Sequence, residues 1–517
     1  MTDRRDPDDR SLFKRSISRR GLLIGAAGAV GGLAVWRLAG GLGSAAPNDG
    51  LAAAFAEREA VDAWAPDPMA VPEGFRVVVI GAGIAGSTAA YFVRRALGDG
   101  VRIVVHEKND RVGGRVRSTI LAGGHIELGA TLLHSSNRHL VGIARSAGLV
   151  PVPPHNRRTE DDGRLAIWSG DDFVFETAPS QWRTTARTFL RYGRAPLRAR
   201  ALVRAFVDDW TQIYALQAQG EAFDTPDALF ERLGLRRFAA EASAEFFRAR
   251  GLSDRFMDEL VTAVSRVNYN QDARLNAFAN AVSLTGAGWA GGALASIRGG
   301  NVQLCEHALR SAGAELRRGV RVAAIAHEPA PEGRPRYRVY RADGPGEAFD
   351  AVVVANPLEF ADLDFPGVDL APGADIRRAY QVTHATFVAG ELDPAYFGRP
   401  PDATLPETVL TMENPEIPFS SIGRVGYAPE LRQPIYKVFS REALDEALLA
   451  RLFRTRGAVH SVRWDAYPVL QPMPEGPPFR LAPRLYYANA MESVVSTMET
   501  QAVAGCNAAA LLRRDLA

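Results

Sequence analysis

Residues 75–107 constrain the fold more than any other part of this chain of 517 residues. Residues 75–80 are almost continuously apolar, as in a strand buried on both faces, and they run directly into Gly81-Ala82-Gly83-Ile84-Ala85-Gly86. A helical stretch to about residue 97 and a second apolar strand over 102–106 follow, and this strand ends at Glu107. The order of strand, glycine-rich turn, helix, strand and acid predicts a dinucleotide-binding βαβ unit.

Each glycine of this turn has a physical reason. Gly81 permits the tight turn, Gly83 lets the backbone approach a pyrophosphate, and Gly86 allows the helix to pack closely on the strand. The helix N-terminus after Gly83 offers free N–H groups and a partial positive charge to the phosphates. The carboxylate of Glu107 is placed to accept both ribose hydroxyls, and it disfavours a cofactor with a 2′-phosphate.

A second glycine motif indicates which dinucleotide is bound. The sequence Arg111-Val112-Gly113-Gly114-Arg115 follows the acid, and Ile126-Glu127-Leu128-Gly129-Ala130 comes shortly after it. The Arg-x-Gly-Gly-Arg segment resembles the second FAD motif of the flavin amine-oxidase superfamily, where it supports the pyrophosphate and the flavin end. The alternative is an ordinary glycine turn flanked by solvated arginines.

Later parts of the chain complete the same domain. Residues 321–325 predict a strand, which in that superfamily lays its backbone against the adenine, and residues 349–356 and 484–489 predict two further strands. A helix from about residue 496 to 512 can direct its N-terminus at the electron-rich N1–C2=O edge of a flavin. The predicted divisions are a linker over 47–74, an FAD-binding domain over 75–178, 290–357 and 480–512, and a substrate domain over 179–289 and 358–479.

Several internal motifs point to one family of flavoproteins. They lie at residues 132–139, 167–175, 266–271, 299–301, 436–440 and 485–507. Together with the glycine motifs, they make the chain resemble the prenylcysteine oxidases, which are FAD-dependent thioether oxidases, over most of residues 75–512. The resemblance implies an α/β fold, in which a Rossmann-like FAD-binding domain of the amine-oxidase type carries an inserted α+β substrate domain. The residues expected to contact FAD are Gly81, Gly83, Ile84, Ala85, Gly86, Glu107, Lys108, Gly114, Arg115, Gly129, Ala130, Thr131, Leu132, Val322, Glu492 and Met498.

The resemblance also implies an activity. In the family, FAD oxidises the thioether carbon of a prenylated cysteine and yields cysteine, a prenyl aldehyde and hydrogen peroxide. Hydride leaves for flavin N5 because sulfur and the allylic double bond stabilise the resulting cation, and O₂ then restores the flavin. The expected partners are a small apolar thioether and O₂. The alternatives are an amine-oxidase-like or other C–H oxidase with a different apolar substrate, and a flavin electron-transfer protein that is not an oxidase.

This chemistry needs an apolar slot for the substrate. The predicted pocket residues are Phe278, Leu284 and Trp289, near the end of the first inserted segment. Phe206 and Trp210, which stand at helical spacing, are more typical of an ordinary core.

Two residues are candidates for a catalytic role. His134 follows the Gly129 segment and should lie beside the flavin, where a neutral imidazole can order the attacking water. The alternative is a histidine satisfied by the backbone. Lys437 stands in an apolar run of a chain that uses arginine almost everywhere, and a compact ammonium near flavin N5 can hold water or help O₂ accept electrons. The alternative is chance retention or a surface position.

Charge and cysteine counts exclude several other functions. The 61 Lys and Arg nearly balance the 59 Asp and Glu, and the excess lies in residues 1–46, so nucleic acid is not an expected partner. Two cysteines cannot build a four-ligand zinc site or a disulfide framework, and no metal site is expected. Cys305 and Cys506 are expected to be buried thiols, with a single bridge as the alternative.

Residues 1–46 have the pattern of an export signal. Ser18-Arg19-Arg20-Gly21-Leu22-Leu23 pairs two arginines with an apolar stretch over 21–36, and Ser44-Ala45-Ala46 offers small residues for cleavage. The pattern resembles a twin-arginine signal, whose pathway carries folded proteins, so the periplasm is the expected location. The alternative is an uncleaved segment that keeps the protein near the inner membrane, although it is shorter than the roughly 20 residues of a spanning helix.

Overall fold

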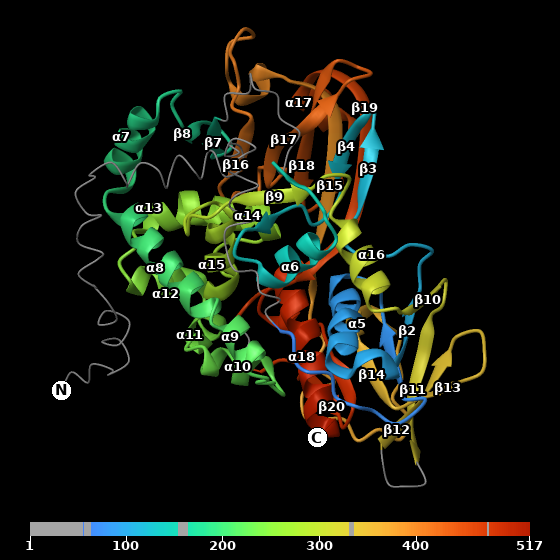
Figure 1. Ribbon diagram of the computed structural model, residues 1–517. Coiled ribbons are helices and arrows are strands. Elements are labelled where there is room, and N and C mark those ends of the chain that lie inside the picture. Colours follow the sequence, from blue (N-terminus) through green and yellow to red (C-terminus); the bar gives the residue numbers. More distant parts are fainter. Residues whose placement is uncertain (1–54, 56–63, 154–163, 330–334, 473–474) are drawn as a thin grey trace, which may run out of the picture.

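A computed structural model describes Phe55 and residues 64–153, 164–329, 335–472 and 475–517 (Figure 1). Residues 1–46, for which an export signal is predicted, lie outside the described residues. Within the described ranges, no helix combines the length and the apolar character needed to cross a bilayer.

A six-stranded sheet takes its strands from three separated parts of the chain. In sheet order they are β10 (Glu315–Arg318), β2 (Arg102–Glu107), β1 (Arg76–Ile80), β14 (Ala351–Val354), β21 (Leu485–Tyr487) and β20 (Arg480–Ala482). The first five pair in parallel, and β20 adds an antiparallel edge. The central strands β1 and β14 are almost completely buried, as their continuous apolar runs predict.

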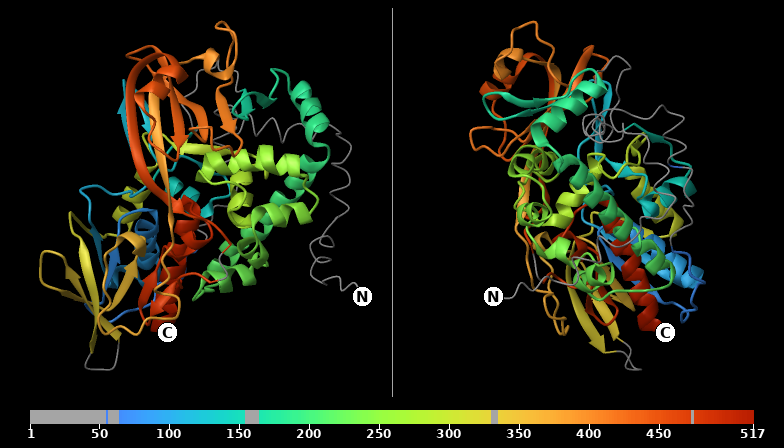
Figure 2. Two further views of the ribbon diagram at one scale, coloured as in Figure 1. Left: turned by 180° about the vertical axis from the view of Figure 1, so that it is seen from behind. Right: turned by 90° about the vertical axis from the view of Figure 1, so that its left-hand side faces the viewer.

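Helices cover one face of this sheet, and a small antiparallel sheet covers the other. The helices are α5 (Ile84–Leu97), α16 (Val302–Ser311) and α18 (Met498–Leu516), and the small sheet consists of β11 (Val322–Pro329), β12 (Pro335–Arg341) and β13 (Glu347–Phe349). Helix α18 runs close beside α5 because Gly505 has no side chain; a Cβ there would lie 2.5 Å from Thr88 Oγ1 (Figures 1 and 2). Cys305 in α16 and Cys506 in α18 are separate buried thiols, as expected.

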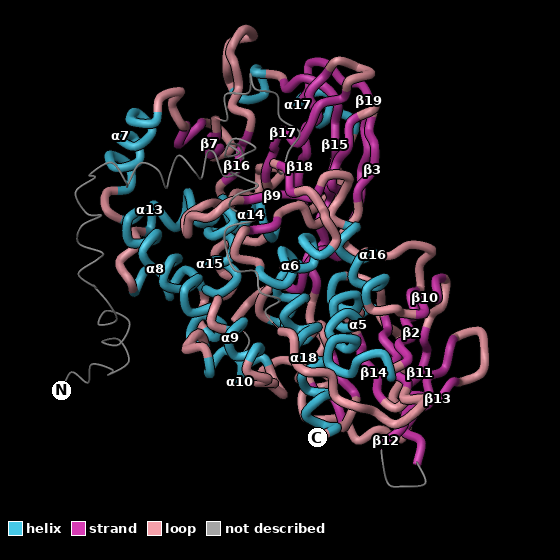
Figure 3. Tube along the Cα trace, viewed as in Figure 1, coloured by secondary structure: helices cyan, strands magenta, loops and turns pink. Residues whose placement is uncertain are grey.

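The second large sheet has seven strands and stands above the nucleotide-binding sheet in Figure 3. In order they are β19 (Phe453–Pro468), β15 (Tyr380–Leu392), β18 (Gln433–Ser440), β17 (Ser421–Ala428), β16 (Thr408–Thr411), β7 (Leu165–Trp168) and β8 (Phe173–Glu176). The hairpin of β3 (Ser118–Leu121) and β4 (Gly124–Glu127) contacts β17 and β19, and helix α17 (Glu446–Leu452) contacts β19. The smaller sheet of β5 (Leu133–His134), β9 (Leu294–Ile297) and β6 (Pro151–Val152) joins the first insertion to the FAD motifs.

Residues 181–286 form a helical layer on the side of the molecule away from β11–β13 (Figure 2). Its helices are α7 (Gln181–Tyr192), α8 (Ala195–Trp210), α9 (Ile213–Ala218), α10 (Pro226–Arg232), α11 (Arg236–Ala240), α12 (Ser243–Ala249), α13 (Asp254–Phe256), α14 (Thr262–Tyr269) and α15 (Ala277–Gly286). Phe206 and Trp210, which stand at helical spacing in the sequence, both lie in α8. Helix α6 (Arg138–Ser146) packs between α16 and α18.

Arg266 and Asn270, from one of the internal motifs, tie this helical layer to the seven-stranded sheet. The buried Arg266 guanidinium donates hydrogen bonds to Thr411 Oγ1 at 2.9 Å and to the Phe419 carbonyl at 3.2 Å. Asn270, which ends α14 with a φ of 54°, donates from Nδ2 to the Ser440 carbonyl at 3.1 Å. The motif therefore fixes the spacing between two walls of the cavity described below.

Two stretches differ from the sequence-based prediction. Residues 349–356 were expected to form one strand, but β13 ends at Phe349 and β14 begins at Ala351 in another sheet. Asp350 makes this change of sheet by accepting a hydrogen bond from the backbone N–H of Arg76 at 2.8 Å. In the predicted linker, Trp64 is buried edge-to-face against Phe92, so the stretch from Trp64 onward packs on the nucleotide-binding core.

Candidate active site

One cavity of about 900 Å³ joins the nucleotide-binding motifs to the inserted region. At one end its wall comes from the glycine turn after β1, the end of β2 and the first turn of α18. At the other end it comes from α8, α14 and α15 and from strands β17 and β18. A single space therefore runs from the predicted FAD site to the predicted substrate region.

The glycines of the turn after β1 have two different roles. Two of them are required because a side chain would collide with the protein, whereas the third leaves open space in the cavity. Gly81 has a φ of 104°, and a Cβ on it would lie 2.9 Å from the Ala355 carbonyl oxygen. A Cβ on Gly86 would overlap the Gly81 carbonyl oxygen, and Gly86 is buried behind the turn rather than on the cavity wall. A Cβ on Gly83 would meet no protein atom closer than 3.9 Å, and Gly83 lines the cavity. The open space at Gly83 fits a phosphate that approaches the backbone.

Glu107 is held at the cavity wall by three hydrogen bonds. It accepts from the Ala82 backbone N–H at 2.9 Å, and from the backbone N–H and Nδ2 of Asn109 at 2.9 and 2.6 Å. The Val320 N–H donates to the Glu107 carbonyl at 2.9 Å, which brings the chain leading into Val322 alongside. Lys108, the following residue, also lines the cavity. This places the carboxylate and the start of β11 together, as expected for ribose and adenine binding.

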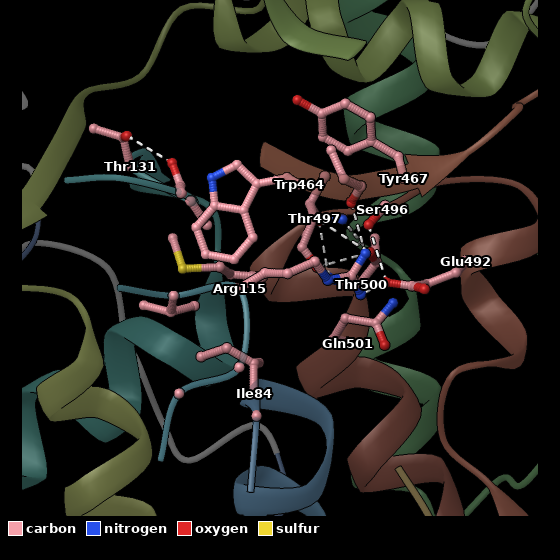
Figure 4. A pocket seen from close by; sticks show the side chains of 18 of the residues that line it. Ile84, Arg115, Thr131, Trp464, Tyr467, Glu492, Ser496, Thr497, Thr500 and Gln501 are labelled. Carbon is pink, nitrogen blue, oxygen red and sulfur yellow. Dashed lines mark hydrogen bonds and ion pairs between the residues drawn. The ribbon is translucent and has the colours of Figure 1, made fainter. Parts of the chain in front are cut away.

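Arg115, which is half-buried, and Glu492, which is fully buried, form an ion pair on the cavity wall (Figure 4). Arg115 also donates to the Ala466 carbonyl at 2.7 Å. Glu492 accepts from the Tyr380 hydroxyl at 2.9 Å and from Ser496 Oγ at 3.1 Å. Burial acts to raise the pKa of Glu492, but the charges of Arg115 and Arg378 and the hydrogen bonds from Tyr380 and Arg115 together outweigh it and lower that pKa below its ordinary value. The pair therefore stays ionised and holds the second FAD motif against the end of the chain.

The first turn of α18 combines a side-chain cap with a polar side chain that has no hydrogen-bond partner among the described residues. Thr497 and Thr500 cap the helix reciprocally, each hydroxyl accepting the other's backbone N–H at 3.1 Å. Gln501, in the next position, is buried on the cavity wall (Figure 4), and neither its amide nitrogen nor its amide oxygen has a partner among the described residues. The same holds for the side-chain oxygens of Asn356 and Asn489, which also line the cavity. Such atoms are costly to bury unless a polar ligand satisfies them, which fits a bound dinucleotide.

All of the predicted FAD residues except Gly86 lie on this one cavity wall. Asn301, from the 299–301 motif, holds part of that wall in place. Its Nδ2 donates to the carbonyls of Ala130 and Thr131 at 3.1 and 2.9 Å, and its backbone N–H donates to Glu127 Oε1 at 2.9 Å. This motif therefore positions residues 129–132 rather than contacting the cavity itself.

The apolar end of the cavity differs from the prediction. Phe206 and Trp210 of α8 line it together with Val282 of α15, whereas Phe278, Leu284 and Trp289 do not. Phe278 lies one layer behind, with its ring centroid 4.8 Å from that of Phe206 and 5.4 Å from that of Trp210. Leu284 and Trp289 are fully buried in the core. Helical periodicity identifies the apolar face of a helix but not whether that face meets other side chains or an open cavity. The cavity wall is therefore formed by Phe206 and Trp210, which were expected in the core, and the core contains Phe278, which was expected on the wall.

Trp464 and Tyr467, which the sequence analysis did not single out, also line the cavity (Figure 4). Trp464 Nε1 donates to the Leu128 carbonyl at 3.2 Å, and the Tyr467 ring lies edge-to-face with Tyr269, 5.2 Å between centroids. Tyr269 belongs to the motif that contains Arg266, which was the one available signal for this aromatic pair. Both rings are placed by the long strand β19 and by α14.

Lys437 lies on the cavity wall in β18, with its Nζ 4.3 Å from the centroid of the Phe439 ring and 5.5 Å from that of Phe387. Burial lowers the pKa of Lys437 to about 8, while the nearby charge of Glu127 acts to raise it. Burial also raises the pKa of Glu127 to about 7, against the opposing effects of the Asn301 N–H and Lys437. The two groups therefore titrate close to neutral pH, with Lys437 on the cavity wall and Glu127 next to the wall residue Leu128.

His134 lines the cavity, but both of its ring nitrogens have protein partners. Nε2 lies 2.8 Å from the Gly291 carbonyl and Nδ1 lies 2.6 Å from Ser136 Oγ. Because a carbonyl only accepts, Nε2 carries the proton and Nδ1 accepts from the serine. This geometry corresponds to the satisfied-histidine alternative. His139 is buried away from the cavity wall, with Nε2 2.7 Å from Gln217 Oε1.

Comparisons with known proteins agree with these motifs. Residues 175–517 match the family model described as prenylcysteine lyase, and residues 79–146 match that of an NAD(P)-binding Rossmann-like domain. The chain belongs to the prenylcysteine lyase family. Farnesylcysteine lyase of Arabidopsis thaliana is 32% identical over 455 residues, which cover 84% of this chain and 87% of that protein. Prenylcysteine oxidase 1 of Homo sapiens is 32% identical over 457 residues, which cover 84% of this chain and 88% of that protein.

Solved structures with the same fold include putrescine oxidase bound to putrescine. It aligns with a TM-score of 0.53 at 13% identity, over 86% of this chain and 99% of that one. The predicted fold class, a Rossmann-like α/β domain of the amine-oxidase type with an inserted region, is confirmed. As a member of the prenylcysteine lyase family with both glycine motifs on one cavity, the protein is an FAD-dependent oxidoreductase.

Proposed function

We propose that this protein oxidises the thioether of a prenylated cysteine. The observation that carries the proposal is the cavity, because one space is polar along the FAD motifs and apolar where α8 and α15 enclose it. A prenyl chain matches the apolar end in chemistry, and the thioether then lies toward the cofactor end. Relatives named for prenylcysteine and farnesylcysteine support the same substrate class.

The proposed reaction converts the thioether, water and O₂ into free cysteine, a prenyl aldehyde and hydrogen peroxide. The carbon between the sulfur and the double bond loses two electrons and one hydrogen, and the oxygen of water becomes the aldehyde oxygen. When bound, FAD supplies the acceptor for this hydride and passes the electrons to O₂. The hydrogen lost by the carbon and the two hydrogens of water end in the thiol and in hydrogen peroxide, so the reaction is balanced.

The chain's own residues bind and orient the substrate. Phe206, Trp210 and Val282 exclude water from the prenyl chain, and this burial is the main source of affinity for an apolar tail. Tyr269 and Tyr467 line the same cavity as Arg115, and their hydroxyls are candidate partners for a polar cysteine head. Few reacting side chains are required, because the cofactor carries the redox chemistry.

Lys437 is the residue we propose to act on protons and oxygen. Its ammonium lies on the cavity wall between two aromatic rings, in a site that lowers the cost of giving up its proton. A protonated Lys437 stabilises negative charge that develops on reduced oxygen, and Glu127, whose charge acts on the pKa of Lys437, is a group able to return its proton.

The test is the stoichiometry of turnover. Purified protein is incubated in air with farnesylcysteine, and free thiol, farnesal and hydrogen peroxide are each measured. Equal amounts of the three products are expected, and S-methylcysteine, which has no prenyl chain, should react much more slowly. Peroxide formed from farnesylamine but not from farnesylcysteine would instead indicate an amine oxidase. Flavin reduction without peroxide would indicate an electron-transfer protein.

A further inference from the structure

The outer side of helices α7 and α8 has an unusual composition. Residues 181–205 contain seven arginines and no acidic residue, in a chain whose overall formal charge is only +2. Figure 1 shows α7 at the outer edge of the helical layer, opposite the small sheet β11–β13. We call the exposed side of these two helices the α7–α8 face. It is defined by Trp182, Arg183, Arg187, Leu190, Arg194, Leu197, Arg198 and Arg204.

The backbone geometry of α7 separates a buried stripe from this face. Thr184, Thr188 and Tyr192 are buried at a spacing of four residues, which is one side of a helix. The opposite side exposes Trp182 and Leu190 at 68% and 87%, the two most exposed large apolar side chains among the described residues. Leu197, at the start of α8, adds a third at 42%. Three large apolar side chains exposed within residues 182–197 are more than the scattered single exposures normal for a soluble surface.

The charges of the face arginines are not neutralised by any carboxylate of the described residues. Arg187 donates to the Glu176 carbonyl at 3.1 Å, Arg198 donates to the Gly251 carbonyl at 2.7 Å, and Arg183 lies over the Trp182 ring at 5.3 Å. Among the described residues, none of the five arginines of the face forms an ion pair with a carboxylate. Arg191, which points away from the face, is different: it makes two hydrogen bonds to Glu259 at 2.5 and 2.7 Å.

We propose that the α7–α8 face docks on the surface of an anionic lipid bilayer. Trp182, Leu190 and Leu197 would enter the boundary between headgroups and acyl chains, while the arginines contact lipid phosphates. The combination of exposed arginines and exposed apolar side chains distinguishes a lipid bilayer from a nucleic acid, since both partners carry phosphates. A nucleic acid would use the charges but leave Leu190 and Leu197 in water, whereas a bilayer accepts both kinds of side chain.

Docking on this face also gives the cavity a position relative to the bilayer. Helix α8 carries Leu197 on the face and Phe206, Val207 and Trp210 on the cavity wall. Nine residues separate Leu197 from Phe206, which is about 14 Å along a helix axis. A lipophilic substrate dissolved in the bilayer would therefore lie close to the wall of its binding site. This last consequence depends on the proposed function, but the docking itself does not.

Vesicle binding tests the proposal on the full-length protein with its FAD. Sedimentation with phosphatidylglycerol–phosphatidylcholine vesicles is compared for the parent and for R183Q/R187Q/R194Q. Each arginine near an anionic surface contributes about fivefold to partitioning, so this triple variant should bind about a hundredfold more weakly. The matched control is R102Q/R274Q/R454Q, which removes the same charge from exposed arginines elsewhere and should bind like the parent. Equal binding of both triple variants would overturn the proposal.

A labelling experiment shows which part of the surface meets the lipid, whatever else holds the protein there. Both native cysteines are buried, so an environment-sensitive thiol dye reports on an introduced cysteine. Leu190→Cys should give a blue-shifted, brighter emission with anionic vesicles. Ile120→Cys, at a position 61% exposed on another surface, should not change. An unchanged signal at position 190, or a change there with duplex DNA but not with vesicles, would contradict lipid docking.

Discussion

Arg115 and the fully buried Glu492 form an ion pair although 377 positions separate them in the sequence. Arg115 ends the second FAD motif, and Glu492 stands one turn before the helix that closes the FAD site. The pair therefore joins the beginning and the end of the nucleotide-binding domain at the cavity wall. Glu492 is fully buried and Arg115 half-buried, so removing Arg115 would leave a buried carboxylate without its charge partner, which is costly.

Glu492→Gln should accordingly lose both stability and FAD. We expect the free energy of unfolding to fall by about 1.5–3 kcal/mol, because the buried position 492 loses its charge-assisted hydrogen bond with the half-buried Arg115. Thermal unfolding and the flavin remaining after gel filtration measure the two effects. Glu315→Gln, which breaks the exposed pair with Arg102, is the matched control and should retain FAD. Full flavin content in Glu492→Gln would show that the pair is not needed for the site.

Two glycines of the same turn should fail in different ways. Gly83→Ala has space for its methyl group within the protein, so its unfolding free energy should stay within about 1 kcal/mol of the parent. Its affinity for FAD should fall about tenfold or more, because the methyl group enters the space meant for the cofactor. Gly86→Ala places its methyl group on the Gly81 carbonyl and should destabilise the apoprotein. Unfolding of apoprotein and FAD titration separate the two results, and tight FAD binding by Gly83→Ala would contradict the placement.

The apolar end of the cavity can be tested by substrate length. Trp210→Ala should raise KM for farnesylcysteine about tenfold, because an apolar contact of this size is lost. The effect should shrink for a dimethylallyl thioether, whose shorter chain need not reach α8. Phe278→Ala, one layer behind, should destabilise the fold by about 3–5 kcal/mol while leaving KM of the folded enzyme near the parent value. A larger KM effect in Phe278→Ala than in Trp210→Ala would reverse the assignment of the two rings.

The role of Lys437 predicts a pH dependence of flavin reoxidation. The pKa of Lys437 is about 8, so its ammonium is protonated below this pH and is lost as the pH rises through it. Reoxidation by O₂ in the parent should therefore slow above about pH 8. Lys437→Met should be about tenfold or more slower at pH 7, and Lys437→Arg should be slower than the parent without the decline above pH 8. Stopped-flow reoxidation of the reduced protein provides the rates. A parent-like rate in Lys437→Met would remove this residue from the mechanism.

The predicted export signal offers a matched pair of arginine doublets. Arg19→Lys/Arg20→Lys should keep the protein, with its FAD, in the bacterial cytoplasm, because the twin-arginine pathway requires that pair. Arg4→Lys/Arg5→Lys changes the other doublet of the same segment and should leave export intact. Fractionation of cells into cytoplasm, membrane and periplasm gives the readout. Export of the Arg19/Arg20 variant at the parent level would exclude this signal.

The parts of the site predicted from sequence are those in which neighbouring residues carry the information. Short sequence patterns predict the glycine turn that begins at Gly81, the acid at Glu107 and the motif that ends at Arg115. The structure places these residues on one wall of the cavity. The partner of Arg115 could not be predicted, because no local pattern in the sequence specifies a contact across the whole chain. The unsatisfied amide of Gln501 is likewise visible only once its surroundings are known.

The apolar wall was missed for a different physical reason. Phe206, Trp210 and Phe278 are all buried aromatic residues on helices. Sequence periodicity predicts only that each lies on a buried helix face and does not distinguish between them. Which of them faces an empty space depends on how α8 and α15 pack on each other. That packing is a contact between segments far apart in the chain, such as the one between the Phe206 and Phe278 rings, and neither helix specifies it alone.

Anaerobic addition of farnesylcysteine to the purified flavoprotein tests the central claim most directly. The flavin absorbance at roughly 450 nm should bleach in proportion to the thioether added, and admission of air should restore it with formation of peroxide. A bound flavin that stays oxidised with farnesylcysteine would contradict thioether oxidation while leaving the FAD site intact. Purified protein that folds but binds no flavin would contradict the assignment of the cavity as an FAD site.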